Sequence, residues 1–182
     1  MAVDPMPLKM VFLGWNGYQT SLLHAVAPLN AGQLAFRPQS APGSDITFRS
    51  AGELVTHISQ GRVDWFTHMG SPGIQEIGQQ LAAVRETAGA APIASELVRQ
   101  LEISWQAIAN VLEQWTTADL TRTYPHTYWG KTYAVSYQWT IWRILTHDVQ
   151  HGGELALLLG MQGVHLPELG DLGGHLTEPP LV

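Results

Sequence analysis

The sequence predicts an all-α protein, an antiparallel four-helix bundle with long connections and one short extra helix. Three observations lead to this prediction: apolar residues recur at helical spacing in several long segments, strand-like alternation is weak, and glycine and proline gather between the periodic segments. An apolar fraction of 45% beside a charged fraction of 13% is typical of a globular chain with large buried faces. We expect one bundle domain over residues 1–165 and an irregular C-terminal tail over residues 166–182.

The first half of the chain predicts two long helices and one short helix. Apolar periodicity predicts a helix over about residues 8–29, followed by an irregular, proline-rich loop to residue 44. The second helix should begin near Thr47 or Ser50, because Glu53 stands three residues after Ser50 as in a capping box. It should end before Gly70, and residues 74–87 should form the short amphipathic helix, which the small-residue run 88–92 separates from the next helix.

The second half predicts two long helices joined by an extended excursion. A third long helix should begin at Ser95 and end near Thr116. Residues 119–135 are rich in Thr and Tyr, which favours an extended or hairpin-like segment that covers one mouth of the bundle. The last helix is expected over about residues 136–159, closed by Gly160 and later Gly163. Four tryptophans at helical positions are expected to fill space between helices: Trp65, Trp105, Trp139 and Trp142.

The composition narrows the classes of function. Nine Lys and Arg residues against 15 Asp and Glu residues give a formal net charge of −6, and the basic residues are scattered, so nucleic acid is not an expected partner. No segment approaches the roughly 20 apolar residues of a membrane span, so we expect a cytoplasmic protein without a membrane partner. The chain contains no cysteine, and any metal ligands must therefore be imidazole or carboxylate groups.

A pair of histidines in the last predicted helix is a candidate for metal binding. His147 and His151 stand four residues apart, so both imidazoles leave one helix face about one turn apart. Two histidines alone bind a metal weakly, and such a pair also arises by chance in a chain with eight histidines. His57 lies on the inward stripe of the second helix, where an isolated histidine is more often a core residue than a ligand.

The order of these residues resembles the DinB and YfiT-like metal-dependent proteins, which are four-helix bundles with a histidine triad. In that family one ligand comes from the second helix and two from a His-x-x-x-His pair on the last long helix. The resemblance therefore implies His57, His147 and His151 as the metal ligands. It departs at Asp148, where Glu is more usual. The resemblance extends along nearly the whole chain and rests on three groups: Leu34, Arg37, Pro38 and Pro42; Glu53, Leu54 and His57; Leu145, His147, His151, Gly152, Leu155 and Leu158.

Three neutral imidazoles would leave one or more coordination positions of a divalent ion open, which is the pattern of a catalytic site. Such a ligand set suits zinc, nickel, iron or manganese. Glu154 shares the helix face of the two paired histidines and is a candidate proton carrier or hydrogen-bond acceptor, or else the partner of an ordinary helix salt bridge. Asp148 either orients a ligand from the side or faces solvent. We take both carboxylates as catalytic candidates.

Three residues near the start of the last helix are candidates for substrate binding. Tyr128 and Trp129 lie in the extended segment before this helix and are expected to line the mouth of a pocket. Arg143 stands one turn before His147 and is expected to attract an anionic substrate toward the same cavity.

The leading functional hypothesis is a metal-dependent enzyme with a small-molecule substrate. Some proteins of the resembled family transfer low-molecular-weight thiols, so the resemblance implies transfer of such a thiol to an electrophile, with metal-assisted hydrolysis as the nearest variant. The alternative is a non-enzymatic bundle that binds a metal or small ligand and in which the metal is structural or sensory. Apolar surface on the first and last helices is compatible with a homodimer.

A zincin-type protease is discounted. The sequence has Asp148 where the catalytic Glu of that motif belongs, and Leu157 where a third histidine would follow His151.

Overall fold

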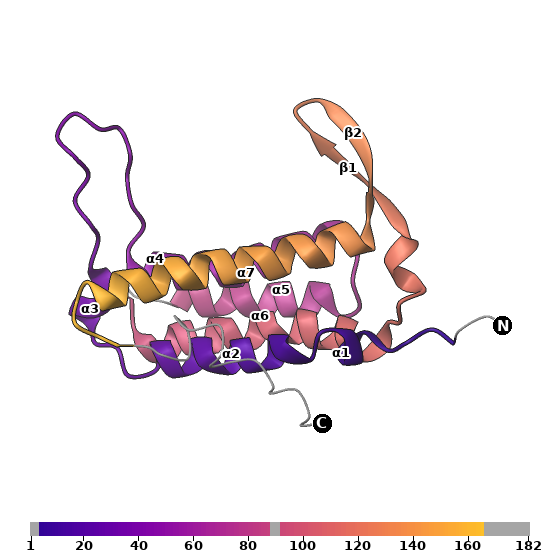
Figure 1. Ribbon diagram of the computed structural model, residues 1–182, viewed down its shortest axis with the longest axis horizontal. Coiled ribbons are helices and arrows are strands. Elements are labelled where there is room, and N and C mark those ends of the chain that lie inside the picture. Colours follow the sequence, from indigo (N-terminus) through magenta and orange to yellow (C-terminus); the bar gives the residue numbers. More distant parts are fainter. Residues whose placement is uncertain (1–3, 88–91, 166–182) are drawn as a thin grey trace, which may run out of the picture.

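The computed structural model describes residues 4–87 and 92–165, so the expected C-terminal tail and most of the run 88–92 lie outside the described residues. The long helices lie side by side as a helical bundle, which confirms the predicted class (Figure 1). The elements, in chain order, are α1 (Leu8–Val11), α2 (Leu13–Val26), α3 (Ala31–Ala35), α4 (Ala51–Met69), α5 (Ile74–Thr87), α6 (Ala94–Gln114), a 3-10 turn (Asp119–Thr121), β1 (Thr123–Tyr128), β2 (Lys131–Ser136) and α7 (Tyr137–Gly160).

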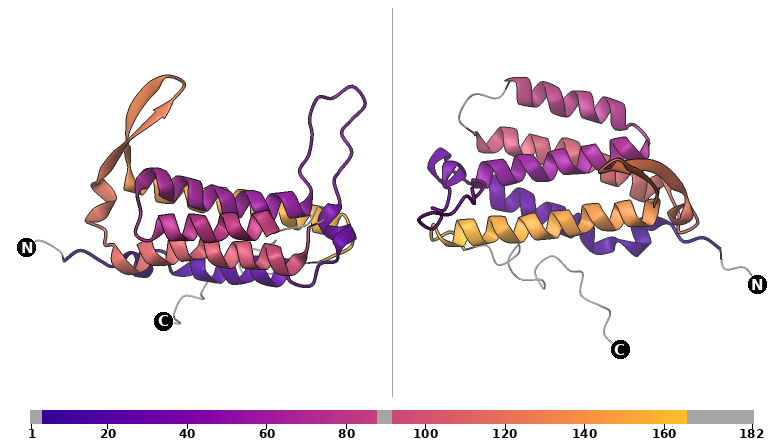
Figure 2. Two further views of the ribbon diagram at one scale, coloured as in Figure 1. Left: turned by 180° about the vertical axis from the view of Figure 1, so that it is seen from behind. Right: turned by 90° about the horizontal axis from the view of Figure 1, so that it is seen from above.

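Helix α4 has the most partners in the bundle. It packs against α6 and α7, while α2 and α5 both pack against α6. The view from above shows α5 on one side of α4 and α7 on the other (Figure 2). The loop before α4 and the β1–β2 hairpin project from the same side of the bundle, near its opposite ends (Figure 1). None of the described helices is long and apolar enough to cross a membrane.

Two apolar clusters form the core, and a polar layer lies between them along α2, α4, α6 and α7. One cluster includes Phe66, Ile108 and Ile141, and the other includes Ile58 and Leu155. Buried polar residues occupy the intervening helical positions, and this interruption of the core is where the candidate site is built. The polar layer contains Gln19, Ser59, Arg62, Ser104, His147, Asp148 and His151.

Side-chain caps and glycine set the limits of α4 and α7. Ser50 Oγ accepts a hydrogen bond from the backbone N–H of Glu53, and the Glu53 carboxylate accepts one from the N–H of Ser50, so the predicted capping box is present. Gly70, with φ of 67°, ends α4 in the left-handed conformation. Ser136 is both the last residue of β2 and the N-cap of α7, so strand and helix are joined without a linker.

The predicted extended excursion is a two-stranded antiparallel hairpin. Thr123 pairs with Ser136 and Tyr128 pairs with Lys131. The base of the hairpin is anchored in the core, because Tyr124 is buried and its hydroxyl lies 2.7 Å from Thr140 Oγ1. The tip projects beyond the bundle (Figure 1).

Several sequence-based predictions about the first helix and its loop need correction. The helix expected over residues 8–29 is broken at Phe12 and ends at Val26. At Phe12 φ is −115° and ψ is 38°, outside the helical region. The backbone N–H of Leu8, at the start of α1, donates to the carbonyl of Trp115 after the end of α6. The loop after α2 contains the short helix α3, which Asn30 opens with a capping box.

The predicted C-terminus of α7 and the roles of the tryptophans also differ from expectation. Gly160 remains helical, and Gly163 takes the positive φ. Trp139 and Trp142 do not fill the core: their exposed fractions are 44% and 63%. Trp65 and Trp105 are partly buried against the core, whereas the buried tryptophans are Trp15 and Trp115.

Candidate metal centre

Three imidazoles converge between α4 and α7. His57 comes from α4, while His147 and His151 come from α7, and one ring nitrogen of each lies within 4.8 Å of the others. The Nε2 atoms of His57 and His147 are 3.2 Å apart. The three residues could therefore hold a metal ion, as expected from the sequence.

A close approach of α7 to the α4 backbone makes this convergence possible. Gly61 stands one turn after His57, and a Cβ atom at Gly61 would lie 2.5 Å from Cε1 of His147. Real Cβ contacts are essentially never this short, so the imidazole of His147 lies on helix backbone that only glycine leaves uncovered. The glycine sets the position of this ring.

The protonation of the imidazoles suits metal binding. Burial, reinforced by His151 and His57, lowers the pKa of His147 to about 3. Burial also lowers the pKa of His57, with a further contribution from Arg49. Both rings are therefore neutral at neutral pH, and their nitrogen lone pairs are available to an ion without loss of a proton.

The distances also fit a metal centre. Two nitrogen ligands, each about 2.0–2.1 Å from a tetrahedral ion, stand roughly 3.3 Å apart. The observed 3.2 Å between the Nε2 atoms of His57 and His147 matches this spacing. Nδ1 of His147 is buried and has no hydrogen-bond partner among the described residues, while its Nε2 is the nitrogen that faces His57.

Glu154 orients the third imidazole. Nδ1 of His151 donates to Oε2 of Glu154 at 2.8 Å, which leaves Nε2 of His151 for an ion. A carboxylate in this position fixes the ring and makes it a stronger ligand. Burial alone would raise the pKa of Glu154, but hydrogen bonds from His151 and Gln150 outweigh it and hold this pKa below its ordinary value. This contact fits both interpretations of Glu154 from the sequence, a hydrogen-bond acceptor for a ligand and the partner of a helix salt bridge. Its role at a metal and its role as a proton carrier remain predictions.

Asp148 faces the core, and the alternative that it faces solvent is wrong. Its carboxylate is fully buried and accepts hydrogen bonds from Nε of Arg62 at 3.0 and 2.9 Å, with Nη2 of Arg62 at 2.8 Å. Nε1 of Trp15 also donates to Oδ2 of Asp148 at 3.0 Å. In the described part of the chain no hydrogen bond joins this carboxylate to the three imidazoles, so its placement favours a structural role.

Sequence reasoning missed Arg62. Its guanidinium is fully buried and also donates to Oε1 of Gln19 at 2.8 Å, so the ion pair with Asp148 connects α2, α4 and α7. The available signal was a charged residue on the otherwise apolar inward face of α4, five residues after His57, because such a residue needs a buried partner of opposite charge.

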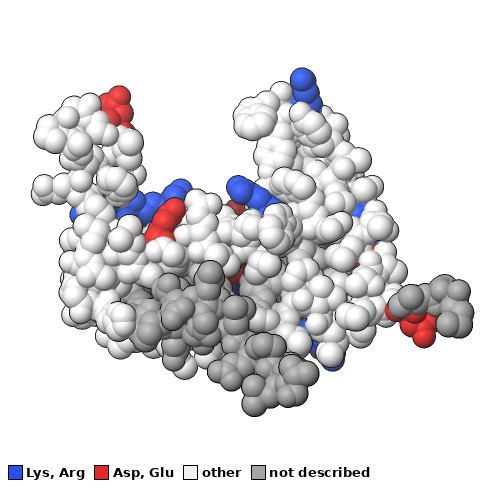
Figure 3. All heavy atoms as spheres, in the orientation of Figure 1, with Lys and Arg blue, Asp and Glu red and all other residues white. Residues whose placement is uncertain are grey.

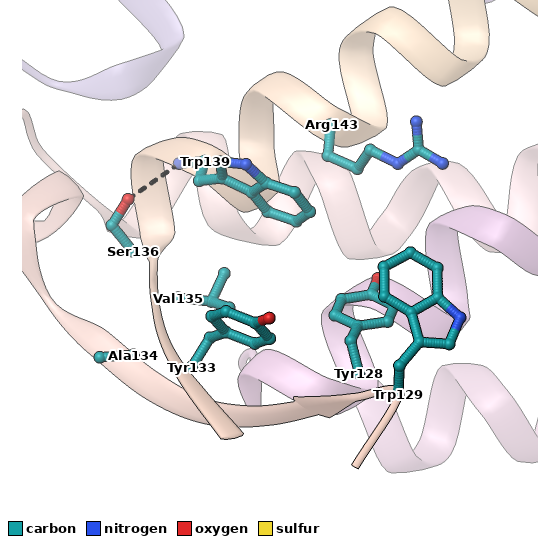
Figure 4. Close-up of a pocket in the computed structure, with 8 residues that line it drawn as sticks. All are labelled: Tyr128, Trp129, Tyr133, Ala134, Val135, Ser136, Trp139 and Arg143. Atoms are coloured by element: carbon teal, nitrogen blue, oxygen red, sulfur yellow. Dashed lines mark hydrogen bonds between the residues drawn. The ribbon is translucent and has the colours of Figure 1, made fainter. Parts of the chain in front are cut away.

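The three predicted substrate-binding residues line one pocket. Tyr128, Trp129 and Arg143 surround a cavity of about 700 Å³ between the hairpin and the first turns of α7 (Figure 4). The space-filling view shows a broad hollow between the two projections of the bundle, with basic side chains on both sides of it (Figure 3). Sequence reasoning missed five further residues of the pocket wall: Tyr133, Ala134, Val135, Ser136 and Trp139.

Comparisons with known proteins agree with the fold. The family model described as the DinB superfamily matches residues 18–155, a range that includes all three histidines. Among solved structures, the chain is similar to a crystal structure of a DinB-like protein from Bacillus cereus ATCC 10987, with a TM-score of 0.57 and 16% sequence identity over 84% of this chain and 91% of that chain. At this identity the similarity shows the fold alone. No curated protein matches the chain.

Proposed function

This chain belongs to the DinB superfamily, and from that membership and its histidine triad we propose that it is a metal-dependent enzyme that transfers a low-molecular-weight thiol to an electrophile. The single observation that carries the proposal is the convergence of His57, His147 and His151, whose ligand atoms lie within 4.8 Å of one another. We further propose that α2, α4, α6 and α7 form the four-helix core and that the protein is of the YfiT-like type.

The triad residues would hold zinc, nickel, iron or manganese through neutral imidazole nitrogens. A bound divalent ion supplies Lewis acidity, which favours the deprotonated form of a thiol and polarises a carbonyl group. Three protein ligands without a carboxylate leave the charge of the ion uncompensated, which favours an anionic partner in the open position.

The side chains around the triad have distinct proposed roles. Glu154 holds the ring of His151, and its Oε1 atom, contacted by Gln150 at 3.4 Å, is the oxygen that would accept the proton of the thiol. The sulfur then bonds to the electrophilic carbon, which either expels a leaving group or passes the negative charge to a neighbouring atom that takes up a proton. Tyr128, Trp129 and Arg143 bind the electrophile. The ion pair of Asp148 with Arg62 holds together α4 and α7, the two helices that carry the triad.

Metal content and thiol-dependent turnover test the proposal. Protein purified without added metal is expected to contain about one divalent ion per chain by elemental analysis. With glutathione, cysteine or coenzyme A as the thiol and chlorodinitrobenzene as the electrophile, it should consume the electrophile faster than the uncatalysed reaction. His57→Ala should lose both the ion and the activity, whereas His24→Ala, an exposed histidine on α2, should keep both.

The outcomes separate the enzyme from its alternatives. Absence of an ion under all loading conditions contradicts the metal centre itself. An ion whose removal lowers the melting temperature, combined with no turnover for any of the thiols, contradicts the transferase and supports a structural or sensory metal. Turnover of an ester or amide in place of thiol transfer would support metal-assisted hydrolysis.

A further inference from the structure

The tip of the hairpin holds a tryptophan in a backbone conformation that disfavours it. Trp129 and Gly130 form the two-residue connection between β1 and β2, and both have positive φ, 46° and 74°. Such turns favour Asn-Gly, because a bulky residue at positive φ is strained. The side chain of Trp129 is also 95% exposed, so burial does not account for the choice of residue. Strain of this kind gathers where a residue contacts a ligand.

The wall of the adjacent pocket is built from flat aromatic rings. Tyr128, Trp129 and Tyr133 rise from the hairpin, and Trp139 extends from α7 over the same space (Figure 4). The exposed fractions of Tyr133 and Trp139 are 47% and 44%, so their rings remain available for contact. The volume of about 700 Å³ lies in the range of small-molecule sites. These rings offer stacking surfaces to a planar ligand.

Arg143 gives the pocket its charge. It is the cation of the pocket wall, which contains no Asp or Glu, and no carboxylate among the described residues forms an ion pair with it. Arg143 opposes the effect of burial on the pKa of Tyr128, so its guanidinium acts within the pocket. A guanidinium with no ion-pair partner among the described residues matches a carboxylate, which it can bind through two parallel hydrogen bonds.

We infer that this pocket binds a planar aromatic carboxylate, with its ring against Trp129 and Trp139 and its acid group paired with Arg143. Identification of this compound as the substrate rests on the proposed function, because the pocket is then the electrophile site of the metal-dependent reaction. The binding itself requires only the residues of the pocket.

The first test compares two isosteric ligands on protein freed of metal by chelation. Isothermal titration calorimetry should show that naphthoate binds roughly fivefold more tightly than naphthamide, since one ion pair at an exposed arginine contributes up to about this factor. Naphthylmethylamine, which is cationic, should bind more weakly than both. Equal affinities, a preference for the amine, or no binding of naphthoate would overturn the inference.

Arg143→Gln tests the acid-binding group. The variant should bind naphthamide as the parent does, but it should bind naphthoate and naphthamide with about equal affinity. Arg99→Gln, an exposed arginine on α6 outside the pocket, is the matched control and should keep the preference. Retention of the full preference in Arg143→Gln would overturn the assignment of Arg143.

Trp129→Asn tests the aromatic wall of the pocket with a substitution that the turn conformation favours. Asn-Gly is the preferred pair for this turn, so the melting temperature should stay the same or rise, while naphthoate affinity should fall roughly fivefold through loss of ring contact. Trp142→Ala, an exposed tryptophan of α7 outside the pocket, should bind naphthoate as the parent does. Unchanged affinity in Trp129→Asn would overturn the inference.

The same data distinguish failure of this inference from failure of the proposed function. Metal-free protein that binds no naphthoate, beside protein that takes up one ion and turns over a thiol, contradicts only the ligand class. Naphthoate binding by a chain that takes up no ion contradicts only the metal-dependent reaction.

Discussion

The backbone of Gly61 lies directly against the imidazole of His147, and a single added carbon at residue 61 would stand 2.5 Å from Cε1 of that ring. The absence of a side chain on α4 therefore determines where a ligand of α7 is placed. Metal affinity should depend on this contact between two residues of which only one is a candidate ligand.

Gly61→Ala should weaken metal binding without unfolding the chain. Alanine favours the helix by up to about 1 kcal/mol over glycine, but its Cβ atom displaces the ring of His147, and a loss of roughly tenfold or more in affinity is expected. A competition titration against a chelating dye measures this loss. Gly153→Ala is the matched control, because open space surrounds that position of α7, and it should raise stability with unchanged metal affinity. Equal affinity in Gly61→Ala and the parent would contradict the role of this contact.

Asp148→Asn should destabilise the fold strongly, because it leaves the charge of Arg62 buried without a counter-ion. The expected cost is about 3 kcal/mol or more in the free energy of urea unfolding. The double variant with Arg62→Met and Asp148→Leu removes both charges and should be more stable than Asp148→Asn. If this double variant keeps its ion and its turnover, Asp148 is structural; loss of turnover with the ion retained would instead support the catalytic role expected from the sequence.

Glu154→Gln should preserve the hydrogen bond to His151 while removing the negative charge. Metal affinity should fall roughly tenfold, since a carboxylate partner strengthens a histidine ligand more than a neutral amide does. Equilibrium dialysis with elemental analysis gives the affinity. Glu102→Gln, an exposed residue of α6, provides the comparison and should leave the affinity unchanged. Identical binding by Glu154→Gln and the parent would show that the charge is unimportant.

The capping box of α4 should give the fold a measurable dependence on acid. In the folded chain the pKa of Glu53 lies below its ordinary value of 4.5. The hydrogen bond from the backbone N–H of Ser50 lowers it most, and Arg37 lowers it further, against the opposing effect of burial. Ionised Glu53 therefore contributes its full stabilisation of the fold above pH 4.5. This contribution is lost as the pH falls through the lower pKa that Glu53 has in the folded chain. The difference in unfolding free energy between the parent and Glu53→Gln should shrink on acidification from pH 7, and a difference that grows would contradict this sign.

Local signals in the sequence were sufficient for most of the helices. The limits of α4 follow from Ser50, Glu53 and Gly70, because capping and left-handed termination act within a few residues. The break at Phe12 could not be predicted in this way, since apolar residues continue through it from Val11 to Leu13 without a local stop signal. The short helix at Ala31 did carry a local signal, the Asn30 and Gln33 box, that was overlooked.

The candidate site shows the same division. The spacing of His147 and His151 and the family resemblance indicated the triad, because helical periodicity determines which face carries both rings. The contact of Gly61 with His147 and the pairing of Arg62 with Asp148 depend on how two helices pack, and one chain's periodicity does not contain that information. Trp139 was assigned to the core because the sequence alone does not show that the hairpin places a cavity beside it.

Strand β2 continues directly into α7 at Ser136, and this continuity limits which substrate lengths can fit. Trp139 in the pocket and His147 in the triad belong to one uninterrupted helix, so they are separated by about 12 Å along its axis at roughly 1.5 Å per residue. No hinge within this helix can shorten that span. Compounds that differ only in the number of carbons between ring and reactive centre should therefore be discriminated by length, with one homologue preferred over shorter and longer ones.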